Sequence, residues 1–260
     1  MRRRILSALP AVALVAVLLG AWELYVELGS VDRLVLPAPH EVGAALWNNA
    51  PMLASNLKPT AEEVVLGIML ALLSGFALAI AIHLSPALRR AVYPIAVGSQ
   101  AVPIAVIAAL LIFWWGFGIL PKLVVITLIC FFPVLVTTVD GLSAVDPEQL
   151  KLLRTLDASR WQAFRFAELP AALPAAISGA RIALTVAVIG AYIAESQTAT
   201  TGAYAGLGHE INADLTALQT SRAYAAAVVL FVFAIACFYT LALAERHLAP
   251  WAHRSRGEVR

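Results

Sequence analysis

Long apolar runs alternate with short polar stretches along the whole sequence. Six of these runs are 17 to 25 residues long, close to the ~20 residues that an α-helix needs to cross the hydrocarbon core of a bilayer. They are Ile5–Trp22, Val64–His83, Ala91–Trp115, Leu123–Val139, Ala171–Ala194 and Ala223–Ala244. The pattern predicts an all-α, polytopic membrane protein with six transmembrane helices, forming a single transmembrane domain over residues 1–260.

Two of the runs carry features that refine this prediction. Pro94 and Pro103 lie in the third run, and a proline inside a helix removes a backbone hydrogen bond. We therefore expect a spanning helix that is kinked near Pro103. The fourth run is the shortest, and we expect Lys122 to lengthen it by extending its ammonium group toward the interface.

Arginine and lysine are distributed unevenly between the two sides of the membrane. With the N-terminus in the cytoplasm, the cytoplasmic pieces carry 13 of these residues and the external pieces carry 4. Cytoplasmic loops are enriched in Lys and Arg, so both termini are predicted to be cytoplasmic. A cleaved signal peptide is the alternative for the first run. Glu23 follows that run in place of a small-residue cleavage motif, which favours a retained span.

The composition agrees with a membrane protein. Hydrophobic residues make up 61% of the chain and charged residues 13%, about half of the ~25% that is usual in soluble domains. The net charge of +2 is too small to indicate nucleic-acid binding. Cys130 and Cys237 lie inside apolar runs, where they are expected to be small buried hydrophobes.

Ionisable residues are scarce within the runs, which argues against an ion-coupled carrier. Arg181 lies in the fifth run, where it either reaches the cytoplasmic headgroups or makes a structural pair. Glu195 closes the same run at its external end. An interfacial position is favoured for Glu195, and a position on a pore or gate is the alternative.

The sequence contains no recognisable catalytic, cofactor or metal motif. It has no Gly-Lys pair and hence no P-loop, and no HExxH or GxSxG motif. The five histidines are scattered, so no metal site is expected. Any energy for uphill transport must come from another subunit.

Two segments between the runs are long. Residues 29–61 are predicted to be external, with a short interfacial helix after Pro37 and Pro39. Residues 140–170 are predicted to be cytoplasmic. Asp146 is a plausible N-cap before Pro147, and Leu150, Leu153 and Leu156 form one apolar face.

A second short helix is predicted to follow a sharp turn in this cytoplasmic segment. Asp157 breaks the first helix, and Ser159 with Gln162 forms a capping box. Pro170 and Pro174 are expected to separate the second helix from the fifth span. From spacing alone, the segment either packs on its own bundle or docks a cytoplasmic partner through Trp161 and Phe164.

The same segment resembles the cytoplasmic loop of permease subunits of bacterial binding-protein-dependent ABC importers. That loop reads EAA, three residues, Gly, nine residues, Ile, one residue, Leu-Pro, and Leu169-Pro170 matches its end. Asp157 stands at the glycine, Ala167 at the isoleucine, and Lys151-Leu152-Leu153 at EAA. Asp tolerates left-handed geometry better than most residues, so it can replace glycine at a turn.

The resemblance extends over nearly the whole chain, to the nitrate, sulfonate, taurine and thiamine-precursor branch. It is carried by Trp22-Glu23-Leu24, Leu36-Pro37-Ala38-Pro39, Gln100-Ala101-Val102-Pro103, Phe131-Phe132-Pro133, Ala194-Glu195 and Gly206-Leu207-Gly208. It implies a type I ABC importer permease-like bundle in a bacterial plasma (inner) membrane. The implied partners are a second permease copy, a cytoplasmic ATP-binding subunit and an external solute-binding protein.

Two sets of functional residues are predicted on this basis. The residues predicted to couple the permease to the ATPase are Leu153, Arg154, Leu156, Asp157, Ala158, Ser159, Trp161 and Phe164. The residues predicted on the translocation path are Ser99, Gln100, Pro103 and Glu195; helix–helix hydrogen bonding is the alternative for the polar pair at 99 and 100. The resemblance favours a pyrimidine-type vitamin precursor as the solute, with sulfonate, taurine and nitrate left open.

Overall fold

The computed structural model describes residues 2–29, 31–197 and 205–248, and within these ranges every regular element is helical. Five helices are long and apolar enough to cross a membrane, and a bent pair brings the number to six. The elements are α1 (Arg2–Leu28), α2 (Pro39–Asn48), α3 (Ala50–Leu84), α4 (Pro86–Ser99), α5 (Ile104–Trp115), α6 (Ile119–Ser143), α7 (Pro147–Thr155), α8 (Arg160–Ala163), the π-helix η1 (Phe164–Glu168), α9 (Leu169–Ser196), α10 (Leu207–Thr216) and α11 (Thr220–Leu248). The six-helix prediction is therefore confirmed when the bent pair α4–α5 is counted as one span.

The centre of the molecule is a three-helix unit of α3, α6 and α9. Their buried core includes Val64, Ile126 and Val134, packed against a row of alanines on α9. Small residues let the backbones approach closely, as is typical of helix packing in membranes. A Cβ on Gly179 would overlap Thr137 of α6, and one on Gly67 would overlap Ile126. The small residues therefore set the spacing of the three helices.

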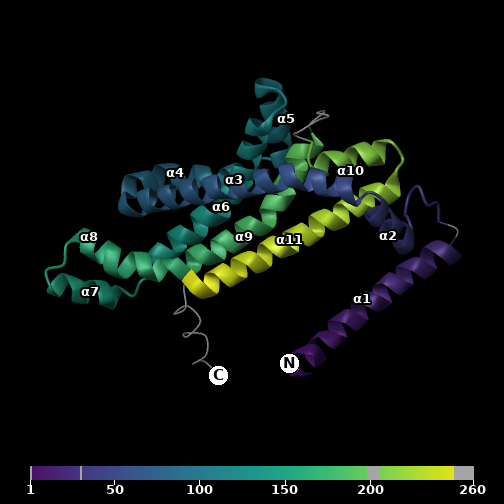
Figure 1. Cartoon of the computed structure of the whole chain (residues 1–260). Coiled ribbons are helices and arrows are strands. Elements are labelled where there is room, and N and C mark those ends of the chain that lie inside the picture. The colour runs from purple at the N-terminus through teal and green to yellow at the C-terminus, as the bar shows by residue number, and fades with distance from the viewer. Residues whose placement is uncertain (1, 30, 198–204, 249–260) are drawn as a thin grey trace.

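The third apolar run differs from its prediction. It forms two helices, α4 and α5, whose axes are bent by 95° at residues 100–103. Pro103 stands at the N-cap of α5 with an extended backbone, so α4 ends before it. The predicted kink lies at the expected residue, but the helix breaks there, and α5 projects from the bundle (Figure 1).

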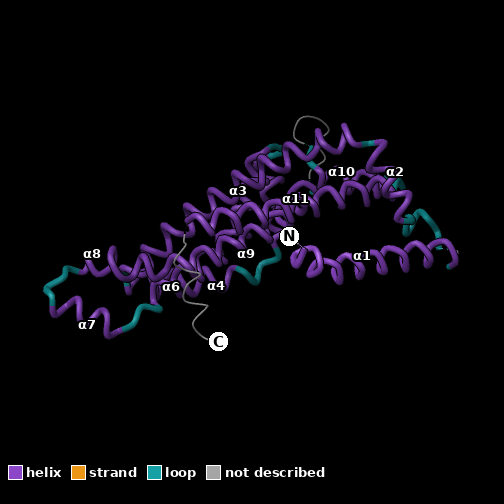
Figure 2. The backbone as a smooth tube through the Cα atoms, turned by 60° about the horizontal axis from the view of Figure 1, so that its bottom comes forward, coloured by secondary structure: helices purple, strands orange, loops and turns teal. Residues whose placement is uncertain are grey.

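Helix α1 is the least integrated span. In both views it runs apart from the bundle and approaches it at its C-terminal end, next to α2 (Figures 1 and 2). There Val26 is buried and Trp22 lies 6.1 Å from Tyr224 of α11, ring centre to ring centre. The short helix expected after Pro37 and Pro39 is present as α2, and it packs against α10 and α11.

Candidate functional site

The cytoplasmic turn predicted at Asp157 is formed by local backbone geometry. Helix α7 begins at Asp146, whose carboxylate accepts a hydrogen bond from the Glu148 amide at 2.9 Å. It ends in a Schellman motif, because the Ala158 and Asp157 amides donate to the Leu153 and Arg154 carbonyls, respectively. Asp157 takes the left-handed position with φ 53°. Asp157 therefore has the left-handed backbone conformation that was expected for a residue replacing glycine at this turn.

The second short helix starts with the predicted capping box. The Gln162 amide donates to Ser159 Oγ at 3.3 Å, and the Ser159 amide donates to Gln162 Oε1 at 2.7 Å. Two of the free amides at this helix start are therefore satisfied within four residues. The turn between α7 and α8 is fixed from both sides, and both helices project beyond the ends of the long helices (Figures 1 and 2).

The connection to the membrane helices differs from the prediction. Pro170 and Pro174 were expected to separate the second helix from the fifth span, but α8 runs through η1 into α9 without a break. Pro170 directly follows η1, where the Leu169 amide donates to the Phe164 carbonyl five residues back. The π-helix therefore shifts the hydrogen-bond register just where proline has no amide to donate. The continuous helical stretch from Arg160 to Ser196 means that a displacement of the turn reaches α9 directly.

Two contacts fasten this segment to the bundle. His83 Nε2 at the end of α3 lies 2.9 Å from Glu168 Oε2. Phe164 is only 3% exposed and packs with Leu142 and Ala172. Trp161 is 60% exposed and stacks on Phe164, with 5.4 Å between the ring centres. The two predicted aromatic anchors therefore occupy different places, since Phe164 lies in the chain's own core and Trp161 lies outside it.

Three of the four predicted path residues, Ser99, Gln100 and Pro103, lie at the break between α4 and α5, whereas Glu195 stands near the C-terminal end of α9. Ser99 and Gln100 are exposed and line a cavity of about 290 Å³, whose opposite wall includes Ile129, Phe132 and Pro133 of α6. The Ser99 hydroxyl donates to the Ala96 carbonyl at 2.8 Å, within its own helix. The pair thus faces a cavity, and among the described residues Ser99 makes no hydrogen bond to another helix.

The prediction for Lys122 is wrong. Its side chain is 1% exposed, and Nζ lies 2.8 Å from Oε1 of Glu63, which is equally buried. The ammonium group does not extend to an interface, because a carboxylate on α3 faces it from 59 residues earlier in the chain. Its hydrocarbon stem adds to the core at the end of α6, and its charge is compensated inside the bundle.

Glu195 lies in the same buried region and has no exposed surface. Its carboxylate accepts hydrogen bonds from Thr60 Oγ1 at 2.7 Å and from the Gly208 amide at 2.6 Å, so the N-terminal end of α10 closes over it. A Cβ on Gly206 would overlap this carboxylate. The interfacial interpretation of Glu195 is wrong for this structure, and its place on the path stays a prediction.

The buried charges show what the hydropathy pattern missed. Glu63 and Lys122 each stand directly before an apolar run and were placed outside the membrane helices, so they did not count against a carrier. The helices begin earlier, at Ala50 and Ile119. A charged residue directly before an apolar run was the available signal, because the helix can begin before the run and carry that residue into the bundle.

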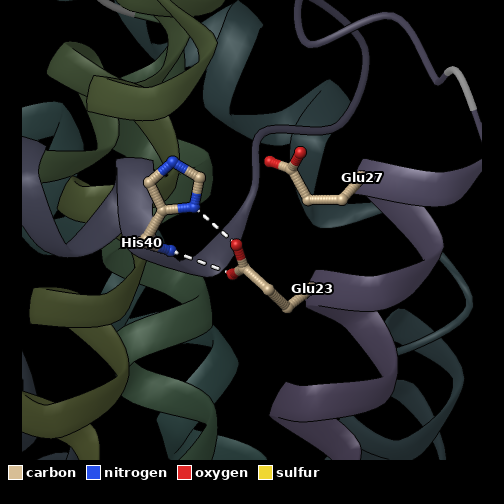
Figure 3. Close-up of side chains that lie close together, drawn as sticks. All are labelled: Glu23, Glu27 and His40. Atoms are coloured by element: carbon tan, nitrogen blue, oxygen red, sulfur yellow. Dashed lines mark hydrogen bonds and ion pairs between the residues drawn. The ribbon is translucent and has the colours of Figure 1, made fainter.

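A second polar cluster joins α1 to α2 (Figure 3). His40 Nδ1 lies 2.5 Å from Glu23, whose carboxylate also accepts the His40 amide, and Glu27 stands nearby. The ligand atoms lie within 4.8 Å of one another, as a metal site would need. Arg33 instead pairs with Glu27 at 3.2 Å and with Glu41 at 2.7 Å, so a guanidinium already supplies the positive charge. The cluster works as a clamp between the two helices.

These features define an integral membrane protein with a preformed turn that projects beyond its long helices. The chain matches the family "Binding-protein-dependent transport system inner membrane component" over residues 63–252, and it belongs to that family. The family is a membrane component of ABC importers of small solutes, and it is a transport component with no enzymatic role.

The sequences of individual relatives align with almost the full length of this chain. The chain is 34% identical to a probable ABC transporter permease protein of Haemophilus influenzae, over 88% of this chain and 91% of that protein. It is 29% identical to the formylaminopyrimidine transport permease protein of Halalkalibacterium halodurans, over 96% of this chain and 98% of that protein. It is 30% identical to the taurine transport system permease protein of Escherichia coli, over 96% of this chain and 90% of that protein.

The fold agrees with a solved structure as well. A chain from a crystal structure of an amino acid ABC transporter with histidines superposes with a TM-score of 0.64, covering 78% of this chain and 97% of that one. The sequence identity is 17%, so this comparison supports the fold, that of a type I importer permease. Membership of the family implies an ATPase subunit and a solute-binding protein as partners.

Proposed function

We propose that the turn at Asp157, Ala158 and Ser159 couples ATP hydrolysis on a cytoplasmic ATP-binding subunit to movement of the membrane helices. The observation that carries this proposal is the rigid, doubly capped turn that projects from the bundle. The permease forms a homodimer around a central path, with both termini in the cytoplasm. Two conformations alternate, and ATP binding on the partner selects between them.

The contacts around the turn support transmission of force. The helix from Arg160 to Ser196 is continuous, and the His83–Glu168 pair ties its start to α3. Leu153, Arg154 and Leu156 flank the turn on the α7 side. A push on the turn therefore moves α3 and α9 together, with little slack in a loop.

Trp161→Ala is expected to weaken binding of the ATP-binding subunit. Trp161 is an exposed aromatic residue next to the turn, and truncating such an anchor typically costs ~2 kcal/mol or more of binding energy, about a 30-fold change in affinity. Co-purification of the ATPase with detergent-solubilised permease, at a series of ATPase concentrations, measures this effect. Substrate uptake should fall in parallel.

The matched control is Tyr239→Ala, an exposed aromatic residue of α11 in the membrane-spanning part of the chain. It should leave ATPase binding unchanged. Full uptake and a stoichiometric ATPase in the Trp161→Ala variant would show that the turn packs only on its own bundle.

We further propose that Ser99 and Gln100, ahead of Pro103, line the solute path, with Glu195 at its external end. The cavity at the break between α4 and α5 supports this assignment, because polar side chains at membrane depth face an aqueous cavity at lower cost than lipid.

Single cysteines at positions 99 and 100 are expected to react with a polar thiol reagent in at least one state of the transport cycle. The background for this measurement is Cys130→Ala/Cys237→Ser, and labelling is followed with and without ATP and vanadate. A cysteine in place of Ile126, which is fully buried, is the unreactive control. Protection of positions 99 and 100 in every state would favour a packing role.

For the solute, we propose a pyrimidine-type vitamin precursor. The formylaminopyrimidine permease aligns with nearly the full length of both chains, which supports this choice. The second candidate is an aliphatic sulfonate such as taurine, since the taurine permease aligns over a similar length with 30% identity. Calorimetry of the cognate solute-binding protein with an aminopyrimidine and with taurine decides between them. Family membership argues against a stand-alone carrier.

A further inference from the structure

A small cavity lies between the two short helices of the cytoplasmic segment. Its volume is about 150 Å³. Leu150 and Arg154 of α7 form one wall, Arg160 and Ala163 of α8 form another, and Ala158 and Glu168 complete the lining. Because the α7–α8 turn is capped on both sides, this cavity is formed before any partner arrives.

The cavity carries unsatisfied positive charge. Neither Arg154 nor Arg160 makes a hydrogen bond or an ion pair through its side chain with any residue that the structure describes, and both side chains are exposed. The acidic residue in the lining, Glu168, is held by His83 at 2.9 Å. Two guanidinium groups therefore face a common space, and the nearby carboxylate is directed to α3.

The size of the cavity limits what it can hold. It corresponds to about five water molecules at ~30 Å³ each, and it is smaller than the ~300–1,000 Å³ of typical small-molecule sites. A nucleotide or a transported solute would not fit. The head group of a single side chain does fit, and guanidinium groups prefer a carboxylate because its two oxygens accept parallel hydrogen bonds.

The surroundings favour a protein as the source of that carboxylate. Leu156 and Trp161 are exposed, and each is close in sequence to residues of the cavity lining. Arginine and aromatic residues with a desolvated centre are typical of protein–protein contacts. The apolar side chains can exclude water around an ion pair, which strengthens it.

We propose that the cavity between α7 and α8 receives an aspartate or glutamate side chain of the ATP-binding subunit, held by Arg154 and Arg160. This inference rests on the proposed function, and it names the chemical groups that make the contact with the ATPase. The two arginines then form a buried part of the contact and do more than raise the rate of association. At this point of the contact the acidic side chain of the ATPase enters the permease.

A zero-length carbodiimide cross-link tests the proposal directly. The reagent joins a carboxylate to an amine and leaves guanidinium groups unreacted, so Arg154→Lys and Arg160→Lys place an amine at the cavity while keeping its charge. In the complex with the co-purified ATPase, each variant should gain an intersubunit amide to an Asp or Glu, located by mass spectrometry. The matched control is Arg165→Lys, an exposed arginine on the same segment outside the cavity lining. Equal cross-linking in the control, or none at the cavity, overturns the proposal.

Neutralisation gives a second, independent measurement. Arg154→Gln/Arg160→Gln should bind the ATPase about tenfold or more weakly than the wild type, with a smaller dependence on salt concentration, whereas Arg165→Gln should bind as the wild type does. If an ATPase co-purifies with the wild-type permease and the double variant binds it equally well, the cavity proposal is wrong and the proposed function still stands. If no ATPase accompanies the wild-type permease, the proposed function fails and this inference with it.

Discussion

Lys122→Met is expected to lower the free energy of unfolding of the permease by about 3–5 kcal/mol, the usual cost of breaking a buried ion pair on one side. The substitution leaves Glu63 with an uncompensated carboxylate at 1% exposure. Methionine has a similar length and no charge, so lost packing contributes little. Denaturant titration of the purified permease in detergent measures the change.

Helix α3, which carries Glu63, offers a matched control for this experiment. Lys58 pairs with Glu62 at 3.9 Å on the exposed face of α3, and both side chains are solvent-accessible. Lys58→Met should change stability by about 0–1 kcal/mol, as for other surface pairs. Glu63→Gln added to Lys122→Met should restore part of the loss, because the buried charge is removed with its partner. Equal effects of Lys122→Met and Lys58→Met would contradict a structural role of the buried pair.

Phe164→Ala is expected to cost about 3–5 kcal/mol of stability, as for other buried aromatic residues. The ring fills the space between α6 and α9 next to His83, with which its centre makes a 6.3 Å contact. Thermal unfolding of the purified permease, without its partners, measures the loss.

Phe166→Ala provides the comparison, since Phe166 lies two residues away and is largely exposed. It should change stability by no more than about 0.5 kcal/mol. The Trp161→Ala variant should also unfold like the wild type, and lose ATPase binding instead. A stable Phe164→Ala permease would mean that this ring is available to a partner after all.

The turn at Asp157 could be predicted closely because its determinants are local. The N-cap at Asp146, the left-handed residue at Asp157 and the capping box at Ser159 each depend on side chains within four residues. Such interactions are visible in sequence spacing. The continuity into α9 was missed, because Pro170 was treated as a helix break although the π-helix directly before it accommodates a residue without an amide.

The buried charges could not be predicted in the same way. Lys122 and Glu63 are 59 residues apart, and Thr60 and Glu195 are 135 apart. Each of these residues stands near the end of an apolar run, where an interfacial position is the simpler interpretation. Only the packing of α3 against α6 and α9 decides that they face one another.

The break between α4 and α5 was predicted in position and underestimated in size. Proline at 103 accounts for the lost hydrogen bond, but it does not fix an angle of 95°. That angle depends on where α5 finds apolar contacts, which include Val125 of α6 and Ala194 of α9. Tertiary contacts of this kind do not appear in the hydropathy of one segment.

The π-helix η1 keeps the turn at Asp157 in rotational phase with α9. A π-turn completes one rotation with one residue more than an α-turn, so Phe164–Glu168 holds an extra residue without turning α8 away from its direction. Deleting one residue from this segment would leave an ordinary α-turn, and Trp161 would still point to the same side of the bundle. Deleting one residue from the α-helical part of α9 would instead rotate the preceding helix by about 100°, because one residue is about 100° at 3.6 residues per turn. The segment Phe164–Glu168 is thus a place where the chain can change in length by one residue while the direction of the contact surface is kept.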